Sequence, residues 1–350
     1  MSLRHKAFSA VFKAIALTRA DRWGRGFAQG LGVILTLHQV RPERAFGFQP
    51  NRLLEITPDF LDTVLRLIRA EGYDLVSLDE AASRLANPRQ GRFFVALTFD
   101  DGYRDTLDHA WPVLAKYDAP WTMFVTTGFA DHSARLWWIE LEEAIRALPE
   151  IAVELPSGRF FARSGTDVEK QQAFEKLYWR LRAEPEAILL STISDLACQA
   201  GIDGPGITER ECLPWGTLRA LSGAPGVTIG AHTLTHPMLA RHDDAFARAE
   251  IANSKARIEA ELGIPVRHFC YPVGDPTSAG PREFALAREA GFAAAVTTRP
   301  GHLFAAHASH LHALPRVSLN GHQQTEEAAR ALLSGLPFLL WNRGRRVNVE

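Results

Sequence analysis

FFVALTFDDG, residues 93–102, is the stretch from which the rest of the chain can be interpreted. It begins as a run of apolar and β-branched residues, long enough for a buried strand and too short for an ordinary helix. It ends in two adjacent carboxylates, Asp100 and Asp101, followed by Gly102. Ligands collect beyond the carboxyl ends of parallel strands, and adjacent aspartates there repel each other unless a cation or shared proton intervenes. The alternative is that one aspartate caps the helix after Gly102.

Similar apolar runs alternate with helical patterns along most of the chain. Strands are expected at residues 32–40, 74–78, 93–99, 121–127, 227–231, 267–271, 293–298 and 313–319. Helices are expected between them, at residues 57–72, 79–85, 103–117, 243–262 and 282–290. This alternation predicts parallel βα units, and about eight strands favour closure into a barrel over an open sheet. Pro315 indicates that the last strand is irregular or lies at an edge.

We expect three segments in the chain. Residues 1–30 form an N-terminal amphipathic helical segment, residues 31–322 the barrel, and residues 323–350 a C-terminal helix and tail. Residues 131–215 break the strand–helix alternation and are interpreted as one helical insertion. Its position after a barrel strand places it on the face where loops build active sites.

Composition limits the classes of function. With 350 residues and 46% hydrophobic content, the chain can bury one large core or two smaller ones. A net charge of −1 without long charged blocks gives no electrostatic case for nucleic acid. Three cysteines without metal-ligand spacing favour a reduced compartment. No apolar stretch reaches membrane-spanning length.

The N-terminus superficially resembles a signal peptide. Lys13 interrupts its apolar region, and residues 18–22 make a poor cleavage region, so an amphipathic helix and a cytoplasmic location are expected. The apolar side of this helix either packs on the domain or makes peripheral membrane contact. The second interpretation depends on the basic residues Arg4, Lys6, Lys13, Arg19 and Arg22.

A second motif, GAHTLTHP at residues 230–237, also follows a predicted strand. His232 and His236 would face one side if the backbone made a helical turn, a spacing suited to one metal ion. Alternatively, His236 simply ends a loop before Pro237. Together with the aspartate pair, the histidines suggest an open Asp-His-His site for zinc or a similar divalent ion.

On these two motifs the chain resembles the polysaccharide deacetylases, the carbohydrate esterase family 4 enzymes with the NodB homology domain. TFDDG at 98–102 matches the first family motif, and HTLTH at 232–236 matches the second, His-(Ser/Thr)-x-x-His. The resemblance spans about residues 32–320 and implies a distorted (β/α)7–8 barrel with a helical insertion. It also implies that a metal is bound by three ligands, with a neighbouring aspartate as general base; these residues are Asp101, His232, His236 and, as base, Asp100.

The implied reaction is hydrolysis of the acetamide of an N-acetylated sugar, such as N-acetylglucosamine in an oligo- or polysaccharide. The expected cofactor is Zn²⁺, with Co²⁺, Ni²⁺ or Mn²⁺ as alternatives. The metal polarises the carbonyl and a water, a carboxylate removes the proton, and a backbone N–H helps to stabilise the oxyanion. Two rival functions are hydrolysis of a small non-sugar amide or imide and carbohydrate binding without turnover.

The chain departs from the family in the third motif, normally Arg-x-Pro-Tyr. The matching stretch is CYPVG at 270–274, so arginine and tyrosine are both missing. The N–H of Val273 can still serve the oxyanion, since a backbone donor does not depend on the side chain. Arg316 is the candidate to replace the arginine that holds the catalytic aspartate, with an ordinary surface arginine as the alternative.

The general acid of the family is a histidine in a Leu-x-His motif on the last strand. The predicted last strand does not show that motif cleanly, but the first strand, Leu35-Thr36-Leu37-His38, carries a histidine at its carboxyl end. The chain is therefore similar to the circularly permuted branch that includes biofilm poly-N-acetylglucosamine deacetylases, which implies His38 as general acid. The alternative is a core or loop histidine. The remaining cluster is expected in loops: His302, His307, His310 and His312.

Several residues are candidates for substrate contact. Aromatic rings stack on sugars, although most aromatic residues pack in cores. The candidates are Tyr271, Pro272, Trp137, Trp138 and Trp215.

Overall fold

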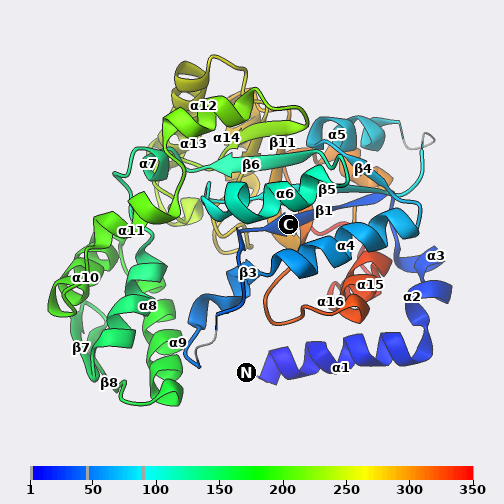
Figure 1. The fold of residues 1–350 in the computed structure, drawn as a ribbon. Helices are drawn as coiled ribbons and strands as arrows, with labels where there is room; N and C mark the ends of the chain where they lie inside the picture. The colour runs from blue at the N-terminus through cyan, green and yellow to red at the C-terminus, as the bar shows by residue number, and fades with distance from the viewer. Residues whose placement is uncertain (1–2, 45–46, 88–90, 350) are drawn as a thin grey trace.

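The computed structural model describes residues 3–44, 47–87 and 91–349. Within these residues seven parallel strands close into a barrel, because β1 pairs with β12 on one side and with β5 on the other. Figure 1 shows the helices that surround it, which confirms the predicted α/β barrel. The order is β1 (Gly32–Leu37), β12 (Leu314–Ser318), β11 (Ala294–Pro300), β10 (His268–Cys270), β9 (Val227–Ala231), β6 (Trp121–Val125) and β5 (Phe94–Phe99).

The eighth predicted strand lies outside this circle. β4 (Asp74–Val76) pairs with the first half of β5, whereas β6 pairs with its second half. The register between β11 and β12 shifts between Val296 and Pro300, so the irregularity predicted from Pro315 is present. The alternative, an edge position, does not apply, because β12 has a neighbour on each side. A proline without an N–H is tolerated where ladder bonds are already interrupted.

Strand β5 shows how the sequence directs side chains to the two sides of the barrel. Val95, Leu97 and Phe99 join the large core beneath the outer helices, whereas Phe94 and Ala96 join a cluster in the barrel interior. This alternation follows from the two-residue period of a strand. If the alternate residues that face the barrel interior are followed past the end of β5, they include Asp100.

Helices cover the outside of the barrel and start at recognisable caps. The side chains of Thr57 and Asp243 accept backbone N–H bonds at the starts of α4 and α13. The outer helices are α4 (Pro58–Ala70), α5 (Leu78–Ala86), α6 (Trp111–Ala115), α12 (Trp215–Ser222), α13 (Asp244–Leu262), α14 (Pro281–Glu289), α15 (Glu326–Ser334) and α16 (Leu336–Trp341). Short elements complete the chain: β2 (Gln39–Val40), β3 (Glu55–Ile56), η1 (Pro50–Leu54), η2 (Thr106–Ala110), η3 (Leu239–Arg241) and η4 (Ala305–Ser309).

The insertion has a hydrophobic core of its own and lies to one side of the barrel (Figure 1). The short helix α7 (Thr127–Ala130) precedes it, and its own helices are α8 (Trp137–Ala147), α9 (Asp167–Ala183), α10 (Glu186–Gln199) and α11 (Gly204–Glu211). The expectation of a purely helical insertion is wrong, because β7 (Glu150–Leu155) and β8 (Gly158–Arg163) form an antiparallel hairpin. Residues of β7 alternate between exposed and buried, the period of a strand with one wet face.

The N-terminal segment comprises α1 (Leu3–Thr18), α2 (Ala20–Trp23) and α3 (Arg25–Ala28). Phe12 and Ile15 of α1 are buried in the main core, so the apolar side of this helix packs on the domain. The side chains of Arg4 and Lys6 lie outside the described part of the structure. Among the described helices, none combines the length and apolarity needed to cross a membrane.

Candidate active site

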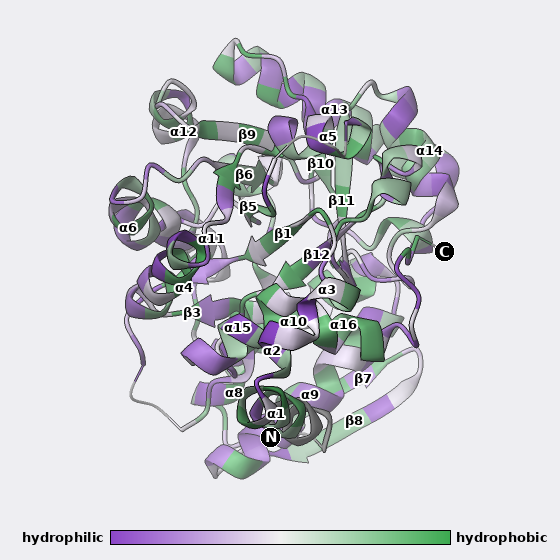
Figure 2. Cartoon of the chain, turned by 90° about the vertical axis from the view of Figure 1, so that its right-hand side faces the viewer, coloured by the Kyte–Doolittle hydropathy of each residue, from purple (hydrophilic) through white to green (hydrophobic). Residues whose placement is uncertain are grey.

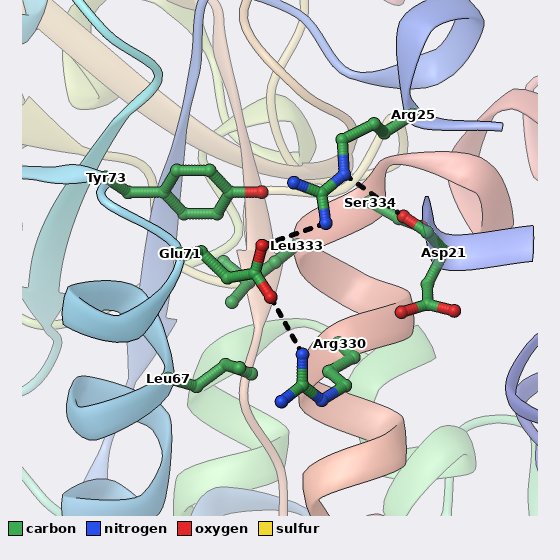
Figure 3. A pocket seen from close by; sticks show the side chains of 8 residues that line it. All are labelled: Asp21, Arg25, Leu67, Glu71, Tyr73, Arg330, Leu333 and Ser334. Carbon is green, nitrogen blue, oxygen red and sulfur yellow. Dashed lines mark hydrogen bonds and ion pairs between the residues drawn. The ribbon is translucent and has the colours of Figure 1, made fainter. Parts of the chain in front are cut away.

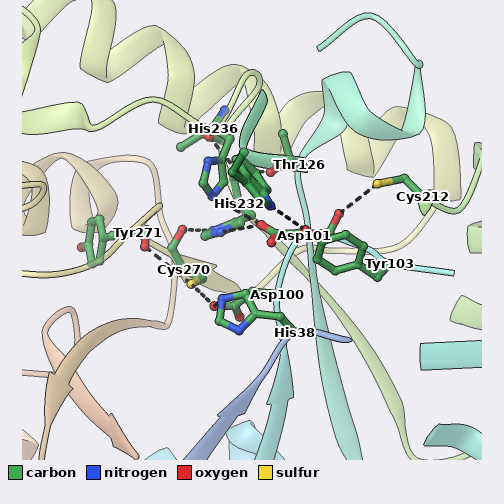
Figure 4. Close-up of polar contacts among 12 residues, drawn as sticks. His38, Asp100, Asp101, Tyr103, Thr126, Cys212, His232, His236, Cys270 and Tyr271 are labelled. Carbon is green, nitrogen blue, oxygen red and sulfur yellow. Dashed lines mark hydrogen bonds and ion pairs between the residues drawn. The ribbon is translucent and has the colours of Figure 1, made fainter. Parts of the chain in front are cut away.

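Side chains from several strands meet at the carboxyl end of the barrel (Figure 4). The inward series of each strand continues into the residues just past its end, so distant parts of the sequence meet there. Polar groups that extend these series are His38 after β1, Asp100 after β5, His232 after β9 and Cys270 at the end of β10. Arg316 of β12 joins them through its hydrogen bond to Asp100.

Asp101, His232 and His236 come together as the sequence predicts. Oδ1 of Asp101 lies 3.4 Å from Nε2 of His232 and 3.3 Å from Nε2 of His236, and all three side chains are at most 8% exposed. Oδ1 of Asp101 is buried without a hydrogen-bond partner. Ligand atoms about 2.0–2.2 Å from a tetrahedral zinc ion are separated by about 3.3–3.5 Å. The donor set and its spacing therefore fit a zinc-like cation.

Two further observations suit the histidines to metal binding. Nδ1 of His232 lies 2.7 Å from the carbonyl oxygen of Cys270. Donation to that carbonyl directs the lone pair of Nε2 towards Asp101 and fixes the ring. Burial lowers the pKa of His236 to about 3, against the opposing charge of Asp101, so this imidazole is neutral.

The backbone of the aspartate motif is unusual. Asp101 and Gly102 have φ values of 72° and 74°, both in the left-handed region. The next helical turn begins only at Thr106, and its N-cap position, Asp105, makes no side-chain capping bond. The alternative that Asp100 or Asp101 caps a helix is therefore wrong, and the two carboxylates are directed into the site.

The second motif is a loop and not the helical turn that was expected. Thr233 and His236 have φ values of 66° and 67°, and the Oγ1 atom of Thr233 accepts the N–H of His236 at 3.0 Å. The carboxylate of Glu250 accepts the N–H groups of Leu234 and Thr235 at 2.8 and 3.0 Å. Side-chain acceptors thus satisfy backbone donors that a helix would pair internally.

Asp100 is held by Arg316 in a bidentate pair. Nη1 and Nη2 of Arg316 donate to Oδ1 and Oδ2 of Asp100, each at 2.7 Å, and the two side chains are 0% and 3% exposed. Burial would raise the pKa of Asp100, but the charge and hydrogen bonds of Arg316 hold it well below its usual range. The alternative of an ordinary surface arginine is wrong.

His38 and Val273 lie in the same region. Nε2 of His38 is 3.9 Å from Oδ2 of Asp100, and the histidine side chain is 21% exposed. Val273 has a φ of 62°, and its N–H donates to no acceptor within the described residues. The structure thus provides a partly exposed imidazole beside Asp100 and, three residues after Cys270, a backbone N–H without an acceptor among the described residues.

Three of the residues predicted to contact substrate lie in the core instead. Tyr271 is fully buried, and its hydroxyl donates to the carbonyl of His312 at 2.9 Å, so its ring points away from the metal ligands (Figure 4). Pro272 is buried as well. Trp137 stacks on Tyr178, and the guanidinium of Arg182 lies over its ring. None of these three presents a face for stacking on a sugar.

The other two tryptophans are also engaged. Trp138 packs against the ring of His236, and its indole N–H donates to the hydroxyl of Tyr103 at 3.1 Å. The side chain of Trp138 is therefore buried and forms one side of the site. Trp215 donates to Asp131 at 2.7 Å and is covered by Arg257.

The cluster of histidines after β11 takes no part in the site. His302 and His307 are fully buried, and Nε2 of His302 lies 2.9 Å from the carbonyl oxygen of Leu332. They belong to the β11–β12 connection, as expected, but are core residues within it. Burial lowers the pKa of each to about 4.

Sequence reasoning missed Glu250 and Tyr103. Glu250 lies on α13, where glutamate is an ordinary helical residue, and no local pattern marks its contact with the histidine loop. Cys270 was expected only to pack, yet its sulfur lies 3.4 Å from Oδ2 of Asp100 and 3.1 Å from Nη2 of Arg316. With Asp100 and His232 it forms a second group whose donor atoms are close together.

Comparison with known proteins agrees with this geometry. The family model described as polysaccharide deacetylase matches residues 87–159 and 190–295, about half of the chain. No curated protein matches the sequence significantly. Solved structures share the fold: a deacetylase, PplD, from Streptococcus pyogenes has a TM-score of 0.58 at 20% identity, over 86% of this chain and 97% of that one.

Two more structures show the same likeness. A polysaccharide deacetylase, BC0361, from Bacillus cereus has a TM-score of 0.54 at 15% identity, over 86% of this chain and 68% of that one. IcaB from Ammonifex degensii has a TM-score of 0.53 at 18% identity, over 86% and 97%. The match of the family model, with both motifs inside it, is specific, and the chain belongs to the polysaccharide deacetylase family.

Proposed function

We propose that this protein is a metal-dependent hydrolase that removes the acetyl group from an N-acetylated sugar, such as N-acetylglucosamine in an oligo- or polysaccharide. One observation carries the proposal. Asp101, His232 and His236 direct three donor atoms to one point, beside a second aspartate that Arg316 keeps ionised.

The three converging side chains would hold the cation, for which we propose Zn²⁺. A site with one carboxylate and two imidazoles is typical of catalytic zinc and leaves room for other ligands. When bound, such a cation polarises the acetamide carbonyl and lowers the pKa of water. Trp138 and Phe129 pack on the ring of His236 and help to exclude bulk solvent from this side.

Asp100 is the proposed general base. Its low pKa keeps it a carboxylate throughout the neutral range, and the pair with Arg316 fixes both of its oxygens. A fixed carboxylate next to the metal ligands can take the proton of the attacking water. Arg316 therefore positions the base, which is the task of the arginine missing from the third motif.

His38 and Val273 complete the proposed machinery. His38 would protonate the leaving amine, because it is the one titratable side chain within 4 Å of Asp100 that also reaches solvent in the described residues. The N–H of Val273 would donate to the oxyanion. Val273 follows β10 by three residues, and its N–H has no acceptor among the described residues.

One alternative function is carbohydrate binding without turnover, and it was suggested by the altered third motif. The Arg316 pair removes that motive, because the aspartate is held by another arginine. The rival of a small amide or imide substrate would use the same groups and differs only in what is turned over.

An acetate-release assay on N-acetylglucosamine oligomers tests the proposal. We expect release by the Zn²⁺-loaded protein, loss with a chelator and recovery when Zn²⁺ is returned. Asp100→Asn should lower the rate by about 10²–10⁴-fold, the usual contribution of a general base. Asp79→Asn is the control, because Asp79 pairs instead with Arg267 and His268.

Two results would count against the proposal. Acetate release that Asp100→Asn leaves unchanged contradicts the assignment of the base. Turnover of small amides without turnover of any glycan favours the rival substrate class.

We also propose a cytoplasmic location. Cys198, Cys212 and Cys270 are all free thiols, which suits a reducing compartment. Recovery of the protein from periplasm or culture medium in cell fractionation would contradict this location.

A further inference from the structure

Exposed apolar side chains gather where the N- and C-terminal segments meet. Ten large apolar residues are exposed in the described part of the chain, and five of them lie within residues 17–27 and 340–341. These five, here called the terminal patch, are Leu17, Trp23, Phe27, Leu340 and Trp341, with exposed fractions of 50–86%. Isolated exposed apolar residues are ordinary, but a cluster that includes two tryptophans indicates a contact surface.

Contacts between the helices bring the two segments together. Nη2 of Arg346 donates to the carbonyl oxygen of Phe27 at 3.0 Å, which ties the C-terminal tail to α3. A Cβ added at Gly24 would lie 2.9 Å from the side chain of Leu336, so α16 packs closely on the α2–α3 junction. Figure 2 looks onto this end of the molecule and shows α2, α3 and α16 close together.

The patch rests on a rigid base. Glu71, at the end of α4, pairs with Arg25 of α3 at 2.9 Å and with Arg330 of α15 at 2.8 Å (Figure 3). The amide of Gln29 donates to the hydroxyl of Tyr73 at 2.9 Å and to the carbonyl of Leu333 at 3.0 Å. The outward side chains are therefore held in a fixed arrangement before any partner binds.

Both of these segments contain more basic than acidic residues. Residues 1–30 contain six arginines and lysines against one acid, Asp21, and residues 323–350 contain four arginines against three acids. The chain as a whole has a net charge of −1, so this excess is local. Arg19, Arg22 and Arg343 are exposed and form no ion pair with any of the described residues.

We propose that the terminal patch docks this protein on the surface of an anionic phospholipid bilayer. Tryptophan and phenylalanine suit the boundary between headgroups and acyl chains, and the surrounding arginines complement anionic lipids. A second copy of the chain fits less well, because a symmetric contact would place the cationic surfaces against each other. From the sequence, membrane contact was considered for the apolar side of the N-terminal helix. The terminal patch is a different surface, because Phe12 and Ile15 on that apolar side of α1 face the core.

Docking in this orientation leaves the catalytic end accessible. α3 ends at Ala28, just before β1 begins at Gly32, so the patch adjoins the amino end of the barrel strands. His38 follows the opposite end of β1, about 20 Å away for a six-residue strand. The candidate active site therefore faces away from the bilayer, and docking should not obstruct it.

Sedimentation with vesicles tests the proposal independently of any enzymatic activity. The full-length protein is mixed with vesicles of phosphatidylcholine alone or with 30% phosphatidylglycerol, and the partition coefficient is measured. We expect binding only with the anionic lipid and weaker binding as salt is raised. Neutralising Arg22→Gln and Arg343→Gln together should lower partitioning by about 25-fold, since each surface arginine contributes about five-fold.

An apolar variant and a matched control complete the experiment. Trp23→Ser with Phe27→Ser should lower partitioning by at least about tenfold, because two rings lose their insertion. Trp179→Ser is the control, since Trp179 is 63% exposed on α9 of the insertion and Trp23 is 68% exposed. Circular dichroism and acetate release should be unchanged in all of these variants, which separates docking from folding and from the proposed function.

Three outcomes would overturn the proposal. The first is equal binding to neutral and anionic vesicles. The second is equal loss in the Trp179→Ser control. The third is a concentration-dependent dimer that Trp23→Ser abolishes while vesicles fail to sediment the wild-type protein, which would assign the patch to self-association.

Discussion

The pair between Arg316 and Asp100 leads to a prediction about stability and activity together. Arg316→Met removes the guanidinium but keeps an unbranched apolar chain in its place. Asp100 would lose two charge-assisted bonds of 2.7 Å and would keep the sulfur contact with Cys270. An ionised carboxylate would then be buried without its counter-charge.

The size of the effect follows from burial. Exposed ion pairs contribute about 0–1 kcal/mol, but these side chains are 0% and 3% exposed, so the value for buried pairs applies. Removing one partner of a buried pair costs about 3–5 kcal/mol, because a charge remains uncompensated. The double variant Arg316→Met with Asp100→Asn buries neither charge. We therefore expect it to be more stable than the sum of the single changes by about 2–3 kcal/mol.

Urea unfolding of the wild type, both single variants and the double variant measures this coupling. A chelator is present in every sample, because a bound metal would add its own contribution to native stability. Acetate release is measured on the same proteins after metal is returned. The double variant should regain stability but not activity, since the carboxylate itself is gone.

Additive losses would refute this reasoning. A coupling energy below about 0.5 kcal/mol is the value for independent sites and would mean that Arg316 does not hold Asp100. Arg299→Met is the matched control, because Arg299 is 1% exposed and donates to the carbonyl of Ala279 at 3.0 Å. Combined with Asp100→Asn, it should give additive losses.

Three further predictions concern other parts of the molecule. His38→Ala should lower acetate release by about 10²-fold or more while metal content, measured by atomic absorption, stays unchanged, and loss of metal would instead make His38 a ligand. Glu250→Ala should weaken Zn²⁺ binding by about 10–100-fold in a competition titration, because the loop that carries His236 loses three hydrogen bonds. Glu259→Ala is its control on the same helix, where Glu259 accepts the N–H of Val266, and an equal effect there would show only general destabilisation. Burial lowers the pKa of His302 in the folded protein to about 4, whereas a histidine in the unfolded chain has a pKa of about 6.5. As pH falls, His302 is therefore protonated in the unfolded chain before it is protonated in the folded protein. The free energy of unfolding should therefore fall by up to about 3 kcal/mol between pH 6.5 and pH 4. In urea unfolding at several pH values, His302→Gln should remove this part of the pH dependence. An unchanged pH dependence in the variant would contradict the prediction.

The sequence predicted the strands well because their signals are local. Each barrel strand is a short apolar run between turn residues, and seven of the eight predicted strands lie in the closed barrel. The β7–β8 hairpin was missed because its alternation lies among longer helical patterns. That the chain is circularly permuted relative to its family stays a prediction, as do the roles of its site residues.

The aromatic residues predicted to contact substrate are more buried than expected, for a physical reason. Whether a ring faces a cleft or the core depends on which elements cover it, and a sequence does not show this. Tyr271 is covered by Phe284 of α14, and Trp137 of α8 by Tyr178 of α9, so the covering ring comes from another element in each case.

The sequence by itself determined the barrel class, the aspartate pair and the two histidines, because strand periodicity and motif spacing are written along the chain. Only the tertiary structure decided what surrounds them. It brought Arg316 from the last strand to Asp100, and Glu250 from an outer helix to the histidine loop. It also joined the two ends of the chain in one apolar, cationic surface. Such contacts arise when strands distant in sequence close a barrel, which brings their ends within reach of one another.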